Sequence, residues 1–270
     1  MGRWFWSLFF LCVPVGAVAL YALCGRVSPL QTATLPANYT ATGETIDHLY
    51  WLIHYLSAAI LLGTGCLLAW SIWRFGGSRP QRARHVHGNL ALEIVWTLIP
   101  AGILVWLAFY QMEAWAENKI LRPQIEVDGV LVDQPPLARI TAKQFGWEVL
   151  YAGPDGKLDS RDDLFVENEL YLPVGENVVL ELRSRDVIHS FFVPELRVKQ
   201  DVVPGLTQAC WFRIESAAQG KRLDIVCAEL CGWGHYKMNA LLYPVSRGQF
   251  EAKLADDAAA RLRVAADPTE

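Results

Sequence analysis

Two long hydrophobic stretches dominate the first part of the chain. In residues 49–73 the only side chain of an acidic or basic type is His54, and in residues 90–110 the apolar run is interrupted by Glu93 near one end and Pro100 in the middle. Each stretch is long enough for a helix to cross about 30 Å of hydrocarbon, and each ends in Trp or Tyr, as interfacial anchors would. We therefore predict an N-terminal transmembrane α-helical hairpin, with helices over 47–75 and 90–111.

The loop between these helices, residues 76–89, is basic. The stretch 74–87 carries Arg74, Arg79, Arg82 and Arg84 and no acidic residue. Short basic loops stay on the cytoplasmic side of a membrane. We therefore expect everything after residue 111 to lie on the outer, periplasmic side of the cell (inner) membrane.

The first 26 residues leave two alternatives open. Residues 4–24 are apolar and follow Arg3, so residues 1–26 are a signal peptide or an extra N-terminal membrane helix. The apolar run is longer than is usual in a signal peptide, and no convincing A-x-A cleavage site follows it. The topology of the rest of the chain is the same in either case.

The pattern changes after residue 111. Residues 112–136 form a polar linker with three prolines, and short alternating or β-branched runs then begin at 137–151, 165–172, 177–185, 206–215, 222–228 and 239–246. Turn residues such as Pro204-Gly205 separate them. We predict one small all-β sandwich or barrel over 137–246. The helical spacing of Phe250, Leu254 and Leu262 predicts a C-terminal helix and tail over 247–270.

Composition and cysteine placement fit this division. The chain is 53% hydrophobic and 19% charged, with a mean hydropathy of +0.20, which is too apolar for an ordinary soluble protein. Among the six cysteines, three lie in apolar membrane segments and Cys210 lies on a predicted strand, where all four are expected to be small buried hydrophobes. Cys227 and Cys231 differ, because they share one loop with other metal-ligating side chains.

That loop is the segment CAELCGWGHYKM, residues 227–238, which holds two thiols, an imidazole and a thioether within twelve residues. A disulfide is the plain alternative outside the cell, but it leaves His235 and Met238 without a reason. Soft donors of this kind suit copper, whereas zinc would leave the Met idle. A mononuclear blue-copper site uses one Cys, so two thiols favour two metal ions bridged by sulfur.

Such a site needs a second imidazole. Beyond residue 111 the chain has one further histidine, His189, in the segment DVIHSFFVP. A lone His before an apolar run is commonly a core residue, but the presence of only two histidines in the outer part of the chain favours His189 as a ligand.

The segments DVIHSFFVP and CAELCGWGHYKM, together with LPVGENVVLELRSRDVIHS and VKQDVVPG, resemble the CuA-bearing subunit II of haem-copper cytochrome c oxidases. The resemblance implies a C-terminal all-β cupredoxin-like sandwich that binds two copper ions (CuA). It implies bridging thiolates from Cys227 and Cys231, terminal imidazoles from His189 and His235, and weaker ligands from Met238 and the Glu229 backbone carbonyl. It also implies that the Glu229 side chain binds magnesium or manganese at the boundary with subunit I.

The family's function follows as an expectation. Subunit II accepts electrons from a cytochrome c-type donor and passes them to haem in subunit I, where dioxygen is reduced to water with coupled proton translocation. Expected partners are subunit I, other oxidase subunits and copper-delivery proteins, with no nucleic acid. The segment EIVWTLIP, beginning at Glu93, is similar to the family's second-helix motif, whose glutamate lies at the cytoplasmic mouth of a proton pathway.

One departure concerns the electron donor. Family members commonly carry Gln-Trp-aromatic-Trp on an early strand, where the first Trp receives electrons, but this chain has Gln144-Phe145-Gly146-Trp147. The residue that receives electrons is therefore Phe145, Trp147 or Trp233, or the donor docks differently. The variant is similar to the branch associated with alternative complex III, which implies a membrane-bound or dedicated cytochrome donor. No C-x-x-C-H motif occurs, so no covalently attached haem c is expected in this chain.

Charge offers a second indication about the donor. Residues 155–176, the acidic segment, contain seven acidic residues against Lys157 and Arg161. An exposed acidic face would steer a basic cytochrome, while a solvated loop is the alternative. A membrane-anchored copper-binding or storage protein without oxidase activity is the other functional alternative, because it would use the same ligand types.

Overall fold

The computed structural model describes residues 2–24, 35–77, 87–153 and 155–266, with side chains up to residue 259. Arg79, Arg82 and Arg84 of the basic loop and the side chain of Leu262 lie outside the described residues. The chain forms two compact units, one of residues 1–36 and 47–113 and one of residues 37–46 and 114–270.

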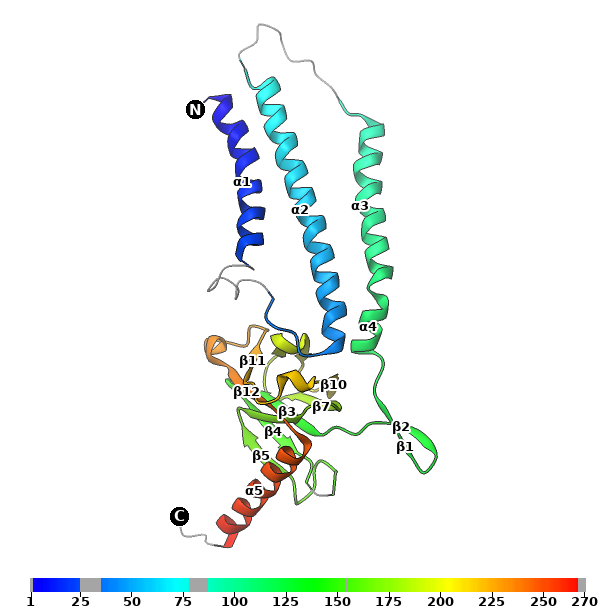
Figure 1. The fold of residues 1–270 in the computed structure, drawn as a ribbon, viewed down its shortest axis with the longest axis vertical. Helices are drawn as coiled ribbons and strands as arrows, with labels where there is room; N and C mark the ends of the chain where they lie inside the picture. The colour runs from blue at the N-terminus through cyan, green and yellow to red at the C-terminus, as the bar shows by residue number, and fades with distance from the viewer. Residues whose placement is uncertain (1, 25–34, 78–86, 154, 267–270) are drawn as a thin grey trace. The chain divides into compact units, whose positions relative to one another are not determined.

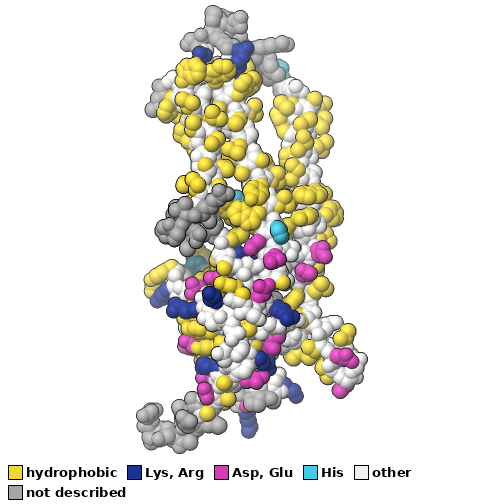
Figure 2. All heavy atoms as spheres, in the orientation of Figure 1, with side chains coloured by type: hydrophobic (Ala, Val, Ile, Leu, Met, Phe, Trp, Pro, Cys, Tyr) yellow, Lys and Arg dark blue, Asp and Glu magenta, His cyan; other side chains and the backbone are white. Residues whose placement is uncertain are grey.

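The first unit is helical (Figure 1). Helices α1 (Arg3–Cys24), α2 (Ala41–Phe75) and α3 (Leu90–Tyr110) are each long and apolar enough to cross a membrane. Hydrophobic side chains cover their surfaces in Figure 2. Asn89 caps α3, because its side chain accepts a hydrogen bond from the Leu92 N–H at 3.2 Å. Chain anchoring in a membrane follows from these helices.

Helix α1 packs against α2. The Tyr21 and Tyr50 hydroxyls are 2.7 Å apart, and the Tyr21 ring stacks on His54 at 4.4 Å between ring centroids. Farther along the pair, a Cβ on Gly65 would lie 2.8 Å from the Phe10 carbonyl oxygen, so a small residue permits the close approach. Both a signal peptide and a retained membrane helix are apolar helices, so these contacts leave the two alternatives for residues 1–26 open.

The second unit begins with elements in a segment that looked like a plain linker. Residues 112–136 contain helix α4 (Met112–Lys119) and a hairpin of β1 (Gln124–Val127) and β2 (Val130–Asp133). The hairpin turns at Asp128-Gly129, where both residues have positive φ angles of 52° and 78°. This Asp-Gly pair, flanked by apolar residues, is the sequence signal that could have predicted it.

The body of the second unit is a β-sandwich (Figure 1), as predicted. One sheet has the strand order β10-β7-β3-β4-β5, with bounds Gln208–Arg213, Asn177–Ser184, Ala138–Lys143, Gly146–Tyr151 and Leu164–Glu167. The other has the order β6-β12-β11-β8-β9, with bounds Glu169–Pro173, Asn239–Val245, Leu223–Cys227, His189–Val193 and Val198–Val202. Helix α5 (Arg247–Ala266) follows, where a helix was expected, and Phe250 joins the core.

The core explains why these segments are strands. Alternate residues of β12 are buried and more exposed in turn, as a strand with one inward face requires. Buried aromatic and aliphatic side chains from both sheets form one cluster, which includes Trp147, Phe191, Phe212, Leu180 and Leu242. Cys210 is buried in this core at 7% exposure, as predicted. The cluster also contains Cys227, Cys231 and Met238, so these ligand-type side chains belong to the core.

Candidate metal centre

Two adjacent strands bring the distant histidine to the cysteine loop. Strand β8 begins at His189 and β11 ends at Cys227, and the two strands pair antiparallel with Cys227 opposite Phe191. Beyond the ladder, the Ala228 N–H still donates to the Ser190 carbonyl at 3.0 Å. The pairing of these strands therefore brings His189 and Cys227, which are 38 positions apart in sequence, into one site.

Residues 227–238, here called the ligand loop, fold back on themselves. The Cys227 N–H donates to the Met238 carbonyl at 3.2 Å, which closes the loop where β12 begins. A short 3₁₀ turn at His235–Lys237 directs His235 and Met238 toward the cysteines. The spacing of the motif is thus explained by one tight loop between two paired strands.

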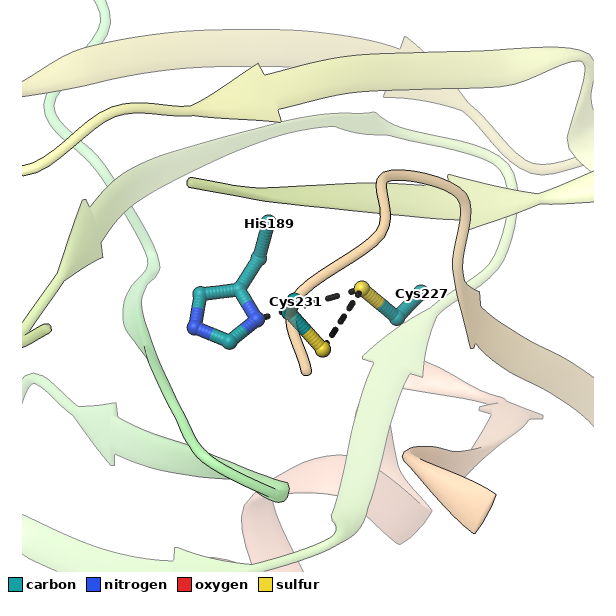
Figure 3. Close-up of side chains that lie close together, drawn as sticks. All are labelled: His189, Cys227 and Cys231. Carbon is teal, nitrogen blue, oxygen red and sulfur yellow. Dashed lines mark hydrogen bonds between the residues drawn. The ribbon is translucent and has the colours of Figure 1, made fainter. Parts of the chain in front are cut away.

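The donor atoms gather closely. The Cys227 and Cys231 sulfurs are 3.9 Å apart, and His189 Nδ1 is 3.8 Å from Cys227 Sγ. Figure 3 shows these three side chains pointing toward one another. These three residues, all buried, form a group whose ligand atoms lie within 4.8 Å of one another. Cys231 Sγ is 3.6 Å from His235 Nδ1 and 3.7 Å from Met238 Sδ, and the Glu229 carbonyl oxygen is 3.2 Å from Cys227 Sγ.

This donor set fits copper. Two sulfurs 3.9 Å apart are not joined by a disulfide, whose S–S bond is about 2.05 Å. Thiol, imidazole and thioether groups are the soft and intermediate donors that copper prefers. The pKa of the Cys231 thiol is raised to about 11, mainly by burial and to a smaller extent by the neighbouring Cys227. A metal must therefore displace the thiol proton to bind here, and the free energy of binding the cation has to exceed that of removing the proton.

Asp186 orients the buried histidine. Its Oδ1 lies 2.8 Å from His189 Nε2, so the proton on Nε2 points to the carboxylate and Nδ1 faces the sulfurs. Burial opposes ionisation of Asp186, but hydrogen bonds from His189 and from the Gln144 and Val187 N–H groups outweigh it and lower the pKa of Asp186. The carboxylate therefore stays charged and holds the ring in one orientation.

The candidate electron-receiving residues occupy different positions. Trp147 on β4 is 1% exposed and its ring centroid is 6.3 Å from that of His189, so it lies inside the sandwich beside the ligand. Phe145, in the turn before β4, is half-buried and meets the ring of Trp233 edge-on at 5.9 Å. Trp233 is 77% exposed, and Lys237 Nζ lies 4.9 Å from its ring centroid.

The two glutamates of interest are both exposed. The backbone carbonyl of Glu229 contacts Cys227, and Glu229 as a whole is exposed. Glu93 is also exposed and lies in the first turn of α3. A carboxylate in the first helical turn is favoured by the helix dipole. Two residues that hydrogen-bond to the ligand segments were not predicted from the sequence. They are Gln144, which contacts Cys231 and Asp186, and Asp186, which contacts His189. An acidic residue three positions before a ligand histidine was the available signal for Asp186.

Three of the seven acidic residues in the acidic segment 155–176 are paired with basic residues from elsewhere in the unit. Asp159 accepts two hydrogen bonds from Arg139, at 2.5 and 2.8 Å. Glu167 pairs with Lys143 at 2.8 Å and Glu176 with Arg247 at 2.7 Å. Asp163 is 7% exposed. These pairings weaken the expectation of a broad negative docking face.

The fold and site define a class: a membrane-anchored β-sandwich protein with a buried His-Cys-Cys cluster suited to copper. Residues 28–114 match the family Cytochrome C oxidase subunit II, transmembrane domain, and residues 153–245 match Cytochrome C oxidase subunit II, periplasmic domain. The chain belongs to the cytochrome c oxidase subunit II family, as its resemblance implied.

The chain is also similar to individual proteins. The chain is 31% identical to probable cytochrome c oxidase subunit 2 of Rickettsia conorii, over 78% of this chain and 67% of the relative. It is 26% identical to alternative cytochrome c oxidase subunit 2 of Bradyrhizobium diazoefficiens, over 92% of this chain and 90% of the relative. The crystal structure of the periplasmic domain of cytochrome oxidase subunit II of Bradyrhizobium japonicum is 25% identical, with a TM-score of 0.39, and covers 44% of this chain and 91% of that one.

Proposed function

We propose that this chain is the electron-accepting subunit of a haem-copper cytochrome c oxidase. It takes electrons from a cytochrome c-type donor at a two-copper centre and passes them to haem in subunit I. Dioxygen reduction to water, coupled to proton translocation, takes place in subunit I and not in this chain.

The observation that carries this proposal is the convergence of six donor atoms. The two sulfurs of Cys227 and Cys231, the two Nδ1 atoms of His189 and His235, the Met238 sulfur and the Glu229 carbonyl oxygen all take part in the contacts of 3.2–3.9 Å given above. Two thiolates are the groups that can bridge two ions, with one imidazole at each end. Bound there, copper would supply reversible one-electron chemistry.

The protein's own groups prepare the site for that role. His189 is 0%, Met238 0% and Cys231 3% exposed, so water is kept from these three donor groups. The sheet register and the Asp186 hydrogen bond hold the ligands in place. Ligands held in this way need little rearrangement when charge changes, which favours rapid electron transfer over substrate chemistry.

We assign contact with the donor to Trp233. Since Trp147 is buried and Phe145 half-buried, Trp233 is the exposed aromatic residue among the three candidates. Leu230 and Tyr236 on the same loop are 77% and 76% exposed. A donor that covers these side chains comes close to the ligands without unfolding the loop. A membrane-bound or dedicated cytochrome, including one in alternative complex III, suits this surface.

Further roles extend the same proposal. The exposed Glu229 side chain is available to bind magnesium or manganese shared with subunit I. Glu93, near one end of an apolar helix, serves at the cytoplasmic mouth of a proton pathway. The chain then crosses the inner membrane several times, with the copper domain on the periplasmic side, and receives copper from delivery proteins. Family membership favours this role over copper storage.

The first experiment is copper reconstitution of the full-length chain in detergent under reducing conditions. We expect two copper ions per chain and an electron paramagnetic resonance hyperfine pattern of one electron shared by two nuclei. Cys227→Ser should abolish that pattern. One copper with a mononuclear pattern, or no copper beside a Cys227–Cys231 disulfide, would overturn the proposal.

A further inference from the structure

The turn between β3 and β4 lies against the ligand loop, although the two are more than 80 residues apart in sequence. Gln144 donates from its side-chain Nε2 to the Cys231 carbonyl at 2.5 Å. The next residue, Phe145, contacts the loop through its ring and meets Trp233 at 5.9 Å. One short turn therefore makes both a polar and an apolar contact with the segment that carries five of the six donor residues.

The same turn reaches the other ligand strand. The Gln144 N–H donates to Asp186 Oδ2 at 2.7 Å, while Asp186 Oδ1 lies 2.8 Å from His189 Nε2. Gln144 thus connects the backbone of Cys231 to the ring of His189 through one carboxylate. Its backbone is linked to one ligand and its side chain to the other.

Two glycines in the ligand loop leave room for this turn. A Cβ on Gly234 would lie 2.5–2.8 Å from three ring atoms of Phe145, closer than Cβ atoms approach other atoms. A Cβ on Gly232 would lie 2.8 Å from Gln144 Nε2 and 3.3 Å from the Phe145 ring. Gly234 has an ordinary φ of −89°, so close approach and not backbone conformation explains its small size.

We propose that the β3–β4 turn is a clamp that fixes the ligand loop relative to His189, with Gln144 and Phe145 as positioning residues. Phe145 acts by packing into the space left by Gly232 and Gly234, and does not itself receive electrons. The clamp rests on the proposed function only in its copper readout, because it also predicts a property of the metal-free chain.

The metal-free test uses cysteine alkylation by iodoacetamide, followed peptide by peptide with mass spectrometry in the full-length reduced chain. Cys231 is 3% and Cys227 9% exposed, so both should react slowly. Gln144→Glu removes the amide donor at nearly constant size, and Gly234→Ala pushes Phe145 from the loop. Each should raise the Cys231 labelling rate by about fivefold or more, since local opening controls access to a buried thiol.

Matched controls separate the clamp from general destabilisation. The side-chain amide of Gln134 also donates to a backbone carbonyl, that of Asn177, at 2.9 Å. Gln134→Glu therefore removes the same type of hydrogen bond as Gln144→Glu, but at a position that does not contact the ligand residues described above. Gly248→Ala adds a Cβ with nothing within 4 Å. Both controls should label Cys231 at the wild-type rate. Equal labelling in the clamp variants and the controls would overturn the clamp.

The copper test gives the second readout. Gln144→Glu and Gly234→Ala should weaken copper binding by about tenfold, the lower end of the effect of residues that support metal ligands, and should change the hyperfine pattern. If wild type binds copper and both variants match it, the clamp fails and the proposed function stands. If wild type binds none, the proposed function fails, and the labelling rates alone decide whether the clamp exists.

Discussion

The ligand loop and the acidic segment differ in which of their side chains reach the surface unpaired. In the loop, the sulfur-containing side chains of Cys227, Cys231 and Met238 are buried, while Leu230, Trp233 and Tyr236 are each at least 76% exposed. In the acidic segment, Asp159, Glu167 and Glu176 are paired with cations from distant parts of the chain. We therefore expect the donor to dock on the exposed aromatic side chains of the loop, and not on the acidic segment.

The largest effect should come from the inner side of the loop. Cys231→Ser should weaken copper binding by more than about 100-fold, because even residues that only support ligands contribute about 10–100-fold. Copper titration of the full-length chain measures this. Cys210→Ser provides the control, since Cys210 lies on β10 in the core and its burial raises the pKa of that thiol to about 12. Copper binding that survives in Cys231→Ser would remove the loop from the site.

The outer side of the loop should decide electron uptake. Trp233→Ala should slow reduction of the copper-loaded chain by reduced cytochrome c about tenfold, because exposed aromatic residues at the centre of an interface contribute most to binding. Phe165→Ala, at a 57% exposed aromatic residue of β5 in the acidic segment, should leave the rate unchanged. Stopped-flow absorbance measures both. The reverse result would move the docking surface to the acidic segment.

Several elements of the fold and several residues of the candidate site could be predicted from the sequence. The apolar runs predicted α2 and α3, the spacing of soft ligands within twelve residues predicted the metal loop, and the count of outer histidines predicted His189. These features are local, or depend on scarcity of a residue type. The C-terminal helix was also visible from its periodicity.

What was missed depends on contacts between distant segments. Strands β8 and β9 were not predicted, because HSFFV is a short run beside a ligand and VKQDV is largely polar. The run 137–151 was predicted as a single run but forms the two strands β3 and β4. The turn between them was missed because Gln144-Phe145 contains neither Gly nor Pro. The cations that neutralise the acidic segment lie as far away as Arg247, and only the folded sandwich brings them together.

Neutralising charges in the acidic segment should have a small effect on electron uptake. The double variant Asp155→Asn/Glu169→Gln should change the reduction rate by less than about twofold even at low ionic strength, where salt screens charges least, because we assign contact with the donor to Trp233 and not to this segment. The rate should also depend only weakly on salt in the wild-type protein. A rate that falls several-fold in the variant, with a steep salt dependence in wild type, would restore electrostatic steering.

The smallest expected effect concerns acid stability. Hydrogen bonds from Arg139 lower the pKa of Asp159, so the pair stabilises the folded state above the unfolded pKa of about 4. That contribution is lost as pH falls through the lower folded pKa. Asp159→Asn should therefore lower the melting temperature slightly at pH 7, and the difference from wild type should shrink below about pH 4. A pH-independent difference between Asp159→Asn and wild type would refute the assignment.

The most direct test of the central claim is an anaerobic reductive titration of the copper-loaded chain, which counts electrons taken up per copper. If two ions share one electron through Cys227 and Cys231, oxidised protein should accept one electron for every two copper ions, in a single step. Uptake of one electron per copper ion, or no reversible uptake, would contradict the account.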